Sequence, residues 1–152
     1  MVASVQADGE EVWSSTSTYL RVGKGDKESG DRGTDFGDPV PGIAAWRLPN
    51  NLGRTYAAVS GDSNPIHLHP LTAKAFGFRR HIAHGMWTKA RAVAAVSNRL
   101  PEQVRVEVGF KKPVFLPSKV AFGFRAEDHG IRFAVTDPHS GAPHVVGRTS
   151  RV

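Results

Sequence analysis

Residues 60–67, which read SGDSNPIH, hold side chains whose types and spacing suit acid–base chemistry on a water molecule. A carboxylate stands at Asp62, an amide at Asn64 and an imidazole at His67, in a turn that a proline stiffens. Because an unperturbed imidazole titrates near neutral pH, Asp62 and His67 could together hold one water molecule and move its protons. The stretch therefore predicts a catalytic acid–base pair.

Residues 82–87, which read IAHGMW, supply the second half of the candidate chemistry. Gly85 stands where we expect a helix to begin, and the first N–H groups of a helix have no partner within it. These groups and the helix dipole favour negative charge, and a residue without a side chain lets a substrate approach closely. The backbone N–H of Gly85 is therefore a candidate donor to an enolate-like oxygen beside a carbonyl.

Structural explanations exist for each residue taken singly. Asp62 could form an Asx turn, Asn64 could belong to an ordinary turn, and His67 could pack in the core. The combination of these residues with the later stretch at 82–87 favours the active-site interpretation over three separate structural roles.

Metal binding is a second alternative, because two pairs of histidines stand close together in the chain: His67 with His69, and His81 with His84. A catalytic zinc ion usually takes three protein ligands in a fixed geometry. No carboxylate here has the spacing of a known helical metal motif. We therefore predict no metal.

The composition bounds the class of protein. The chain has 152 residues, 39% of them hydrophobic, and no cysteine. This length fits one ordinary domain with a substantial core. The lack of cysteine excludes a disulfide framework, thiolate catalysis and cysteine-bound zinc. The formal net charge of +6 favours anionic partners, such as a phosphate-bearing small molecule, an acidic protein or nucleic acid.

The distribution of charged and apolar residues narrows these classes. No run of five or six like charges occurs, so we do not expect a nucleic-acid-binding arm. No apolar run approaches the roughly 20 residues of a membrane helix, and residues 1–11 lack the apolar core of a signal peptide. We expect a soluble, cytoplasmic protein that binds neither nucleic acid nor membranes.

The first 42 residues differ in character from the rest of the chain. Residues 11–22 are rich in β-branched and aromatic side chains, which predicts one strand. Residues 23–42 hold six glycines, two prolines and many charges, which predicts a flexible linker. We therefore expect an N-terminal strand and linker over residues 1–42 and a single domain over residues 43–152. The strand would add to the edge of the main sheet or belong to an upstream domain.

Apolar spacing predicts a short strand over residues 44–48 and then three helices. The first helix follows Asn50 or Asn51 and stops at Gly61, the second spans residues 70–76, and the third spans residues 85–98. The apolar sides expected of the first two are Leu52, Tyr56 and Val59, and Leu71, Ala75 and Phe76. Few charges and many alanines describe the third as a mostly buried helix, slim enough for a sheet to wrap around it.

Beyond residue 103 the hydrophobic period switches to two. Apolar residues alternate in three segments and a fourth begins near the end: residues 104–110, 120–124, 131–135 and 145–146. Turns separate them at residues 117–118, 128–130 and 139–141. The pattern predicts an antiparallel meander with one buried face. Together with the buried helix, it predicts an α+β architecture in which a sheet curls around one helix.

The two stretches and a third one, FKKPVFLP over residues 110–117, resemble the MaoC-like (R)-specific enoyl-CoA hydratases of the hotdog fold. The spacing of Ala73 and Gly77–Phe78 matches as well. The resemblance covers the chain from about Trp46 to the C-terminus. The motifs, occurring together in this order, are far more specific for the family than any one of them alone. It implies a hotdog fold, a curved antiparallel sheet wrapped around one long central helix.

The resemblance also implies roles for individual residues. Asp62 and His67 would be the catalytic pair, Asn64 would support their turn, and Gly85 would lend its N–H to the thioester oxygen. Substrate contacts are expected at four further positions: His84, Met86, Lys111 and Lys112.

These four positions also have structural explanations. His84 would shape the entrance to the helix. Met86 would line an acyl tunnel or pack in the core. Lys111 and Lys112 would meet the phosphates of coenzyme A or lie in solvent.

The activity implied by the resemblance is hydration of a trans-2-enoyl-CoA to an (R)-3-hydroxyacyl-CoA, or the reverse dehydration, in fatty acyl thioester metabolism. Coenzyme A or an acyl carrier protein would carry the acyl group, and no separate cofactor is expected. The family resemblance implies a homodimer or a tandem pair of hotdog units. The alternative is a hotdog module that binds acyl thioesters or supports a partner subunit without turnover.

Overall fold

The computed structural model describes residues 1–19 and 34–152. The chain divides into two compact units, Met1–Gly33 and Thr34–Val152. The end of the expected first strand and most of the expected linker lie outside the described residues.

The described part of the first unit is a β-hairpin of two antiparallel strands, β1 (Val2–Ala7) and β2 (Glu10–Thr16). Asp8 and Gly9 join the strands with positive φ angles of 52° and 83°. Asp-Gly with both residues at positive φ is a preferred two-residue hairpin turn. The prediction of one strand over residues 11–22 misses β1, because this strand is exposed on both faces and carries no regular apolar alternation.

The second unit is built on a five-stranded antiparallel sheet with the strand order β3-β5-β6-β7-β4. The strands are β3 (Ala44–Leu48), β4 (Val104–Phe110), β5 (Ser118–Glu127), β6 (Gly130–Thr136) and β7 (Pro143–Arg151). The expected meander holds for β5, β6 and β7. It is wrong for β4, which pairs with β7 at the edge of the sheet. Consecutive strands are neighbours in roughly two-thirds of cases, and alternation within a strand does not identify its neighbour.

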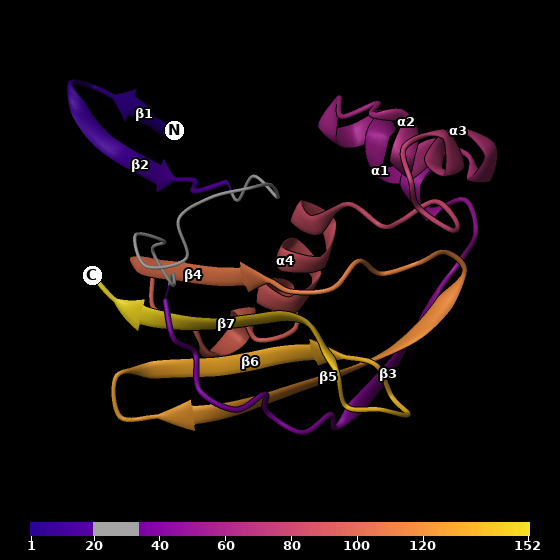
Figure 1. The fold of residues 1–152 in the computed structure, drawn as a ribbon. Coiled ribbons are helices and arrows are strands. Elements are labelled where there is room, and N and C mark those ends of the chain that lie inside the picture. The colour runs from indigo at the N-terminus through magenta and orange to yellow at the C-terminus, as the bar shows by residue number, and fades with distance from the viewer. Residues whose placement is uncertain (20–33) are drawn as a thin grey trace, which may run out of the picture. The chain divides into compact units, whose positions relative to one another are not determined.

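The helices of the second unit are α1 (Leu52–Ser60), α2 (Pro65–Leu68), α3 (Pro70–Ala75), α4 (Gly85–Ala94) and a 3₁₀ turn (Ser97–Arg99). The expected helices are confirmed in α1, α3 and α4, although α4 ends four residues before the predicted Asn98. α4 lies against one face of the sheet, and its first turn points toward the group formed by α1, α2 and α3 (Figure 1).

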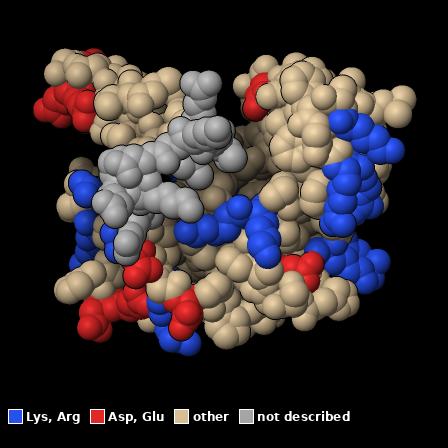
Figure 2. Space-filling model, viewed as in Figure 1, with Lys and Arg blue, Asp and Glu red and all other residues tan. Residues whose placement is uncertain are grey.

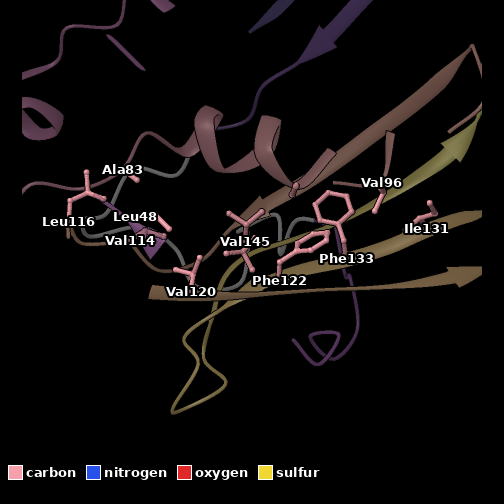
Figure 3. Close-up of a cluster of buried hydrophobic side chains, with 12 residues drawn as sticks. Leu48, Ala83, Val96, Val114, Leu116, Val120, Phe122, Ile131, Phe133 and Val145 are labelled. Carbon is pink, nitrogen blue, oxygen red and sulfur yellow. The ribbon is translucent and has the colours of Figure 1, made fainter. Parts of the chain in front are cut away.

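The main hydrophobic core lies between α4 and the sheet. Phe122 of β5 and Phe133 of β6 are 3% and 1% exposed, and Ala92 and Val96 meet this core from the helical side. Figure 3 shows the rings of Phe122 and Phe133 next to each other, with Val145 of β7 beside them. This core confirms the predicted packing of a sheet against one helix.

A second, smaller core covers the opposite face of the sheet. Its buried members are Phe36, Val40, Ala134 and Val146. Residues 34–42 run across the sheet on this face (Figure 1). The chain passes close to β5 because position 123 is a glycine, where a Cβ would collide with the carbonyl oxygen of Pro41.

Two expectations change as a result of this second core. β6 and β7 have buried residues on both faces, so the prediction of a single buried face is wrong for them. The described end of the expected linker is packed on the sheet, because Phe36 and Val40 supply apolar side chains among the glycines and charges.

Several side chains on the expected apolar sides of the helices are exposed. Val59, Leu71 and Phe76 are 84%, 68% and 64% exposed. The buried residues of α1 and α3 are small: Gly53, Ala57 and Ala73. Within α4 only Thr88 and Ala92 are buried, so this helix is less enclosed than predicted. Close packing of short helices favours small residues, which apolar spacing alone does not reveal.

Positive charge is distributed rather than gathered on the face drawn in Figure 2. Lys and Arg side chains stand there in separate groups, including one beside and below α3, and Asp and Glu also form several separate groups, one of them near the lower border. Among the described residues, no helix has the length and apolar character needed to cross a membrane.

Phe133 offers a test of the main core. Replacing it with alanine removes a ring that is 1% exposed and leaves a cavity, which costs about 3–5 kcal/mol. We expect Phe133→Ala to lower the free energy of unfolding by this amount in urea denaturation. Phe76→Ala is the matched control, because its ring is 64% exposed, and should change this free energy by less than about 0.5 kcal/mol. Equal losses in both variants would contradict the described core.

Candidate active site

His67 lies in α2, a one-turn helix whose start is set by local sequence. The side chain of Asn64 accepts a hydrogen bond from the N–H of Ile66 at 3.3 Å, and Pro65 occupies the first helical position. Gly53 allows α1 to touch α2, because a Cβ there would collide with the carbonyl oxygen of His67. Capping and helix packing together therefore place the imidazole.

The imidazole of His67 is buried and bonded to a main-chain carbonyl. Its Nδ1 lies 2.8 Å from the oxygen of Ile82, in the second of the two stretches. Because a carbonyl oxygen only accepts, Nδ1 carries the proton, and Nε2 of the neutral ring keeps a free lone pair.

Burial is the largest influence on the pKa of His67 and lowers it below the usual 6.5. The hydrogen bond to Ile82 raises this pKa, the neighbouring His84 lowers it, and the carboxylate of Asp62 raises it. The net lowering leaves the ring uncharged at neutral pH, which suits a base.

Asp62 follows α1 directly, because Gly61 ends that helix in the left-handed conformation with a φ of 74°. Its Oδ1 accepts a hydrogen bond from the N–H of Asn64 at 3.1 Å, so the Asx turn offered as a structural explanation is present. The side chain is 53% exposed. A carboxylate oxygen nevertheless lies within 4.8 Å of a ring nitrogen of His67. The turn therefore presents the carboxylate both to solvent and to the imidazole.

His84, the residue immediately before α4, completes the cluster. Its Nε2 lies 2.9 Å from the main-chain oxygen of Asp62 and 3.8 Å from Oδ2 of the same residue. Its ring stacks on that of His67, with 3.7 Å between ring centroids and 26° between planes. Tyr56 of α1 meets His84 edge-on at 4.9 Å. Three elements thus converge on one group of titratable side chains.

A cavity of about 190 Å³ opens beside His67 and Gly85. Its apolar wall includes Ile82, Ala83, Phe110, Val114 and Val145. Lys111, Lys112 and His144 line it as well. Gly85 is the first residue of α4, so this cavity meets the end of the helix where backbone N–H groups lack intrahelical partners.

The structure brings together most of the residues that the sequence singled out. Asp62, His67 and His84 form one cluster. His67 and Gly85 share a cavity with Lys111 and Lys112, which are exposed. A hydrogen bond between His67 and Ile82 joins the two stretches, although these residues are 15 positions apart in the sequence.

Two of the expected site residues lie outside both the cavity and the cluster of Asp62, His67 and His84. Asn64 caps α2, in agreement with its expected support of the turn. Met86 is 54% exposed and lies outside the lining of the cavity, so the expectation that it packs in the core is wrong. The helix turns this side chain outward from the sheet, and its substrate contact stays a prediction.

The cluster has the composition of a metal site, because Asp62, His67 and His84 each offer a ligand atom within 4.8 Å of the others. The rings of His67 and His84, however, are stacked, so the lone pairs of their nitrogens lie in nearly parallel planes. This arrangement does not suit two ligands of the same ion. The histidine pairs considered from spacing are not brought together. Nδ1 of His69 accepts from the N–H of Leu71, and Nε2 of His81 bonds to the oxygen of Asn50.

Two residues of the site were not identified from the sequence, Tyr56 and His144. His144 lines the cavity, and its Nδ1 lies 3.1 Å from the oxygen of Lys112. The pairing of Phe110 with Val145 brings it there. His144 can be assigned to the site only when the order of the strands in the sheet is known. For Tyr56, one signal was present in the sequence, which was its place on the expected apolar side of the first helix.

Comparison with known proteins gives consistent matches. The model of the family described as "MaoC like domain" matches residues 43–142. The 3-hydroxyacyl-thioester dehydratase X of Mycobacterium tuberculosis is 34% identical over 147 residues, which cover 95% of this chain and 52% of that protein. The (R)-specific enoyl-CoA hydratase of Aeromonas caviae is 36% identical over 69 residues, which cover 43% of this chain and 52% of that protein. The chain spans about half the length of these curated relatives.

Solved structures agree with the fold. The crystal structure of HtdX from Mycobacterium tuberculosis matches with a TM-score of 0.84 at 32% identity, over 99% of this chain and 60% of that chain. The (R)-hydratase from A. caviae matches with a TM-score of 0.57 at 25% identity, over 72% of this chain and 92% of that chain. The expected α+β hotdog fold is therefore confirmed.

The titration of His67 tests the electrostatics of the site. We expect the midpoint to lie below 6.5, because burial disfavours the charged ring. Histidine Cε1–H NMR shifts followed against pH give the midpoint, and His67→Gln identifies the signal by its loss. Since the unfolded chain binds this proton near pH 6.5 and the folded chain resists it, His67 should lower the free energy of unfolding as the pH falls below 6.5. A midpoint at or above 6.5 would contradict the buried environment.

Proposed function

Because the chain belongs to the MaoC-like domain family, we propose that it hydrates trans-2-enoyl thioesters to (R)-3-hydroxyacyl thioesters, or catalyses the reverse dehydration. The observation that carries this proposal is the convergence of Asp62 and an uncharged His67 beside a cavity that Gly85 also lines. Two relatives, a 3-hydroxyacyl-thioester dehydratase and an (R)-specific enoyl-CoA hydratase, support the same reaction class by their names.

In the hydration direction, Asp62 and His67 hold one water molecule. The water oxygen bonds to C3 of the enoyl group while the pair removes one of its protons, and the pair delivers a proton to C2. Nε2 of His67 is suited to this transfer, because Nδ1 is committed to Ile82 and leaves the Nε2 lone pair free. A positioned base of this kind contributes about 10²–10⁴-fold in rate. Dehydration follows the same steps in reverse.

Negative charge develops on the thioester oxygen as C3 is attacked. Gly85 meets the cavity at the start of α4, where an unpaired N–H and the helix dipole favour that charge. One such donor is worth roughly 10²–10³-fold. Since only the elements of water are exchanged, the reaction requires no cofactor beyond the thioester carrier itself.

The carrier is proposed to be coenzyme A or an acyl carrier protein, both of which present phosphate. Lys111 and Lys112 are exposed at one wall of the cavity, where they suit contact with phosphate groups. The formal net charge of +6 favours association with either carrier.

A second hotdog unit is also part of the proposal, either as a homodimer or as a tandem pair. β4 stands at one edge of the sheet, and among the described residues no strand pairs with its outer side. Unpaired N–H and C=O groups along such an edge accept another strand readily.

A hydration assay with crotonyl-CoA tests the proposed function. We expect Asp62→Asn and His67→Gln each to lower kcat/KM by about 10²–10⁴-fold, because each removes one member of the pair that moves protons. Asp128→Asn and His129→Gln make the same chemical changes at exposed positions in the β5–β6 turn and should retain wild-type rates. Equal and negligible rates in wild type and Asp62→Asn would instead favour a module that binds acyl thioesters without turnover.

A further inference from the structure

We propose that His84 is a positioning residue that holds Asp62 and His67 in one reactive arrangement. This inference rests on the proposed function, and it replaces the substrate contact that the sequence suggested for His84. The side chain is 2% exposed and lies outside the described lining of the cavity, so a substrate in that cavity would not touch it. Its contacts lead instead to the two reactive side chains.

The first contact ties down the turn that carries the carboxylate. Nε2 of His84 lies 2.9 Å from the main-chain oxygen of Asp62, which can only accept, so Nε2 carries the proton. Oδ2 of Asp62 lies 3.8 Å from the same nitrogen, so this N–H also faces the carboxylate. Although Asp62 is 53% exposed, its backbone is therefore anchored to a buried group.

The second contact sets the plane of the base. The rings of His84 and His67 lie 3.7 Å apart at 26°, and Tyr56 supports His84 from the other side at 4.9 Å. The stack determines the plane of the His67 ring, and the bond from Nδ1 to Ile82 determines its rotation within that plane. Together they leave one position for Nε2 of His67.

His84 also influences the charge of the base. Its proximity lowers the pKa of His67, while the carboxylate of Asp62 raises it. Other titratable groups border the same cavity from the end of β4 and from β7: Lys111, Lys112 and His144. Removal of the His84 imidazole should therefore raise the pKa of His67.

A purely structural role is the competing explanation, because any buried histidine contributes to packing. His81 provides a control for it. His81 is 1% exposed, and its Nε2 lies 2.8 Å from the oxygen of Asn50, but it is outside the cluster of Asp62, His67 and His84. His81→Gln therefore removes a buried, hydrogen-bonded imidazole from the same segment without removing a contact to the reactive pair.

Two substitutions of His84 separate its two contacts. His84→Gln keeps an N–H donor and removes the ring, whereas His84→Phe keeps a ring and cannot donate to Asp62. We expect kcat for crotonyl-CoA hydration to fall about ten- to a hundredfold in both, as small misplacements of reactive groups do. KM should change less than about threefold, because the substrate contacts are intact. His81→Gln should retain kcat even where it lowers the free energy of unfolding.

Imidazole ¹⁵N NMR supplies a second measurement that requires no turnover. In wild type it should place the proton of His84 on Nε2 and that of His67 on Nδ1. The titration midpoint of His67 should rise in His84→Gln and stay unchanged in His81→Gln. A His84 proton on Nδ1 in wild type would overturn the proposal without the use of any variant.

The two measurements distinguish failure of this inference from failure of the proposed function. If the expected protonation and midpoint shift are observed in a protein that does not hydrate crotonyl-CoA, the positioning by His84 stands and the proposed activity fails. If an active protein keeps its kcat and its His67 midpoint in both His84 variants, the positioning role is wrong. Equal changes in His81→Gln would also overturn it, because they would indicate a general loss of packing.

Discussion

The hydrogen bond from Nδ1 of His67 to the oxygen of Ile82 is the interaction on which the rest of the site depends. It joins two stretches that are 15 residues apart, and it assigns the single proton of the neutral ring to Nδ1, so that Nε2 is left as the proposed base. Main-chain bonds on either side reinforce it, from Ile82 to Ile66 at 3.1 Å and from Ala83 to Val114 at 2.8 Å. The short helix that carries the base is thereby attached both to the chain entering α4 and to the wall of the cavity.

The position of His84 follows from this attachment. His84 comes two residues after Ile82, and its extended backbone, with φ −62° and ψ 135°, precedes the first turn of α4. Gly85, the proposed oxyanion donor, is its neighbour. The proposed positioning residue and the proposed oxyanion donor are therefore consecutive residues, so a shift in the start of α4 would move both.

The sequence predicted those features that local signals encode. Gly61 stops α1 and period-two alternation marks β4 to β6, so these elements and the Asp62–His67 turn could be anticipated, whereas α2 was expected only as part of that turn. Features that depend on contacts distant in sequence could not. The pairing of β4 with β7 brings His144 to the cavity. Phe36 packs against residues of β6 and β7, and the glycine-rich sequence around it gives no signal of this contact.

Asp62 and His67 differ in their exposure to solvent, and this difference suggests how water and the acyl group of the proposed reaction each reach the pair. Asp62 is 53% exposed and lies outside the described lining of the cavity, whereas His67 is 8% exposed and forms part of it. Under the proposed reaction, water reaches the pair from the side of the carboxylate, and the acyl group occupies the apolar side of the imidazole. Pairs of titratable groups in unlike environments can take separate roles in one proton transfer. His67 is then the group that both reactants meet, and for this reason its plane, its tautomer and its charge are each set by a different neighbour.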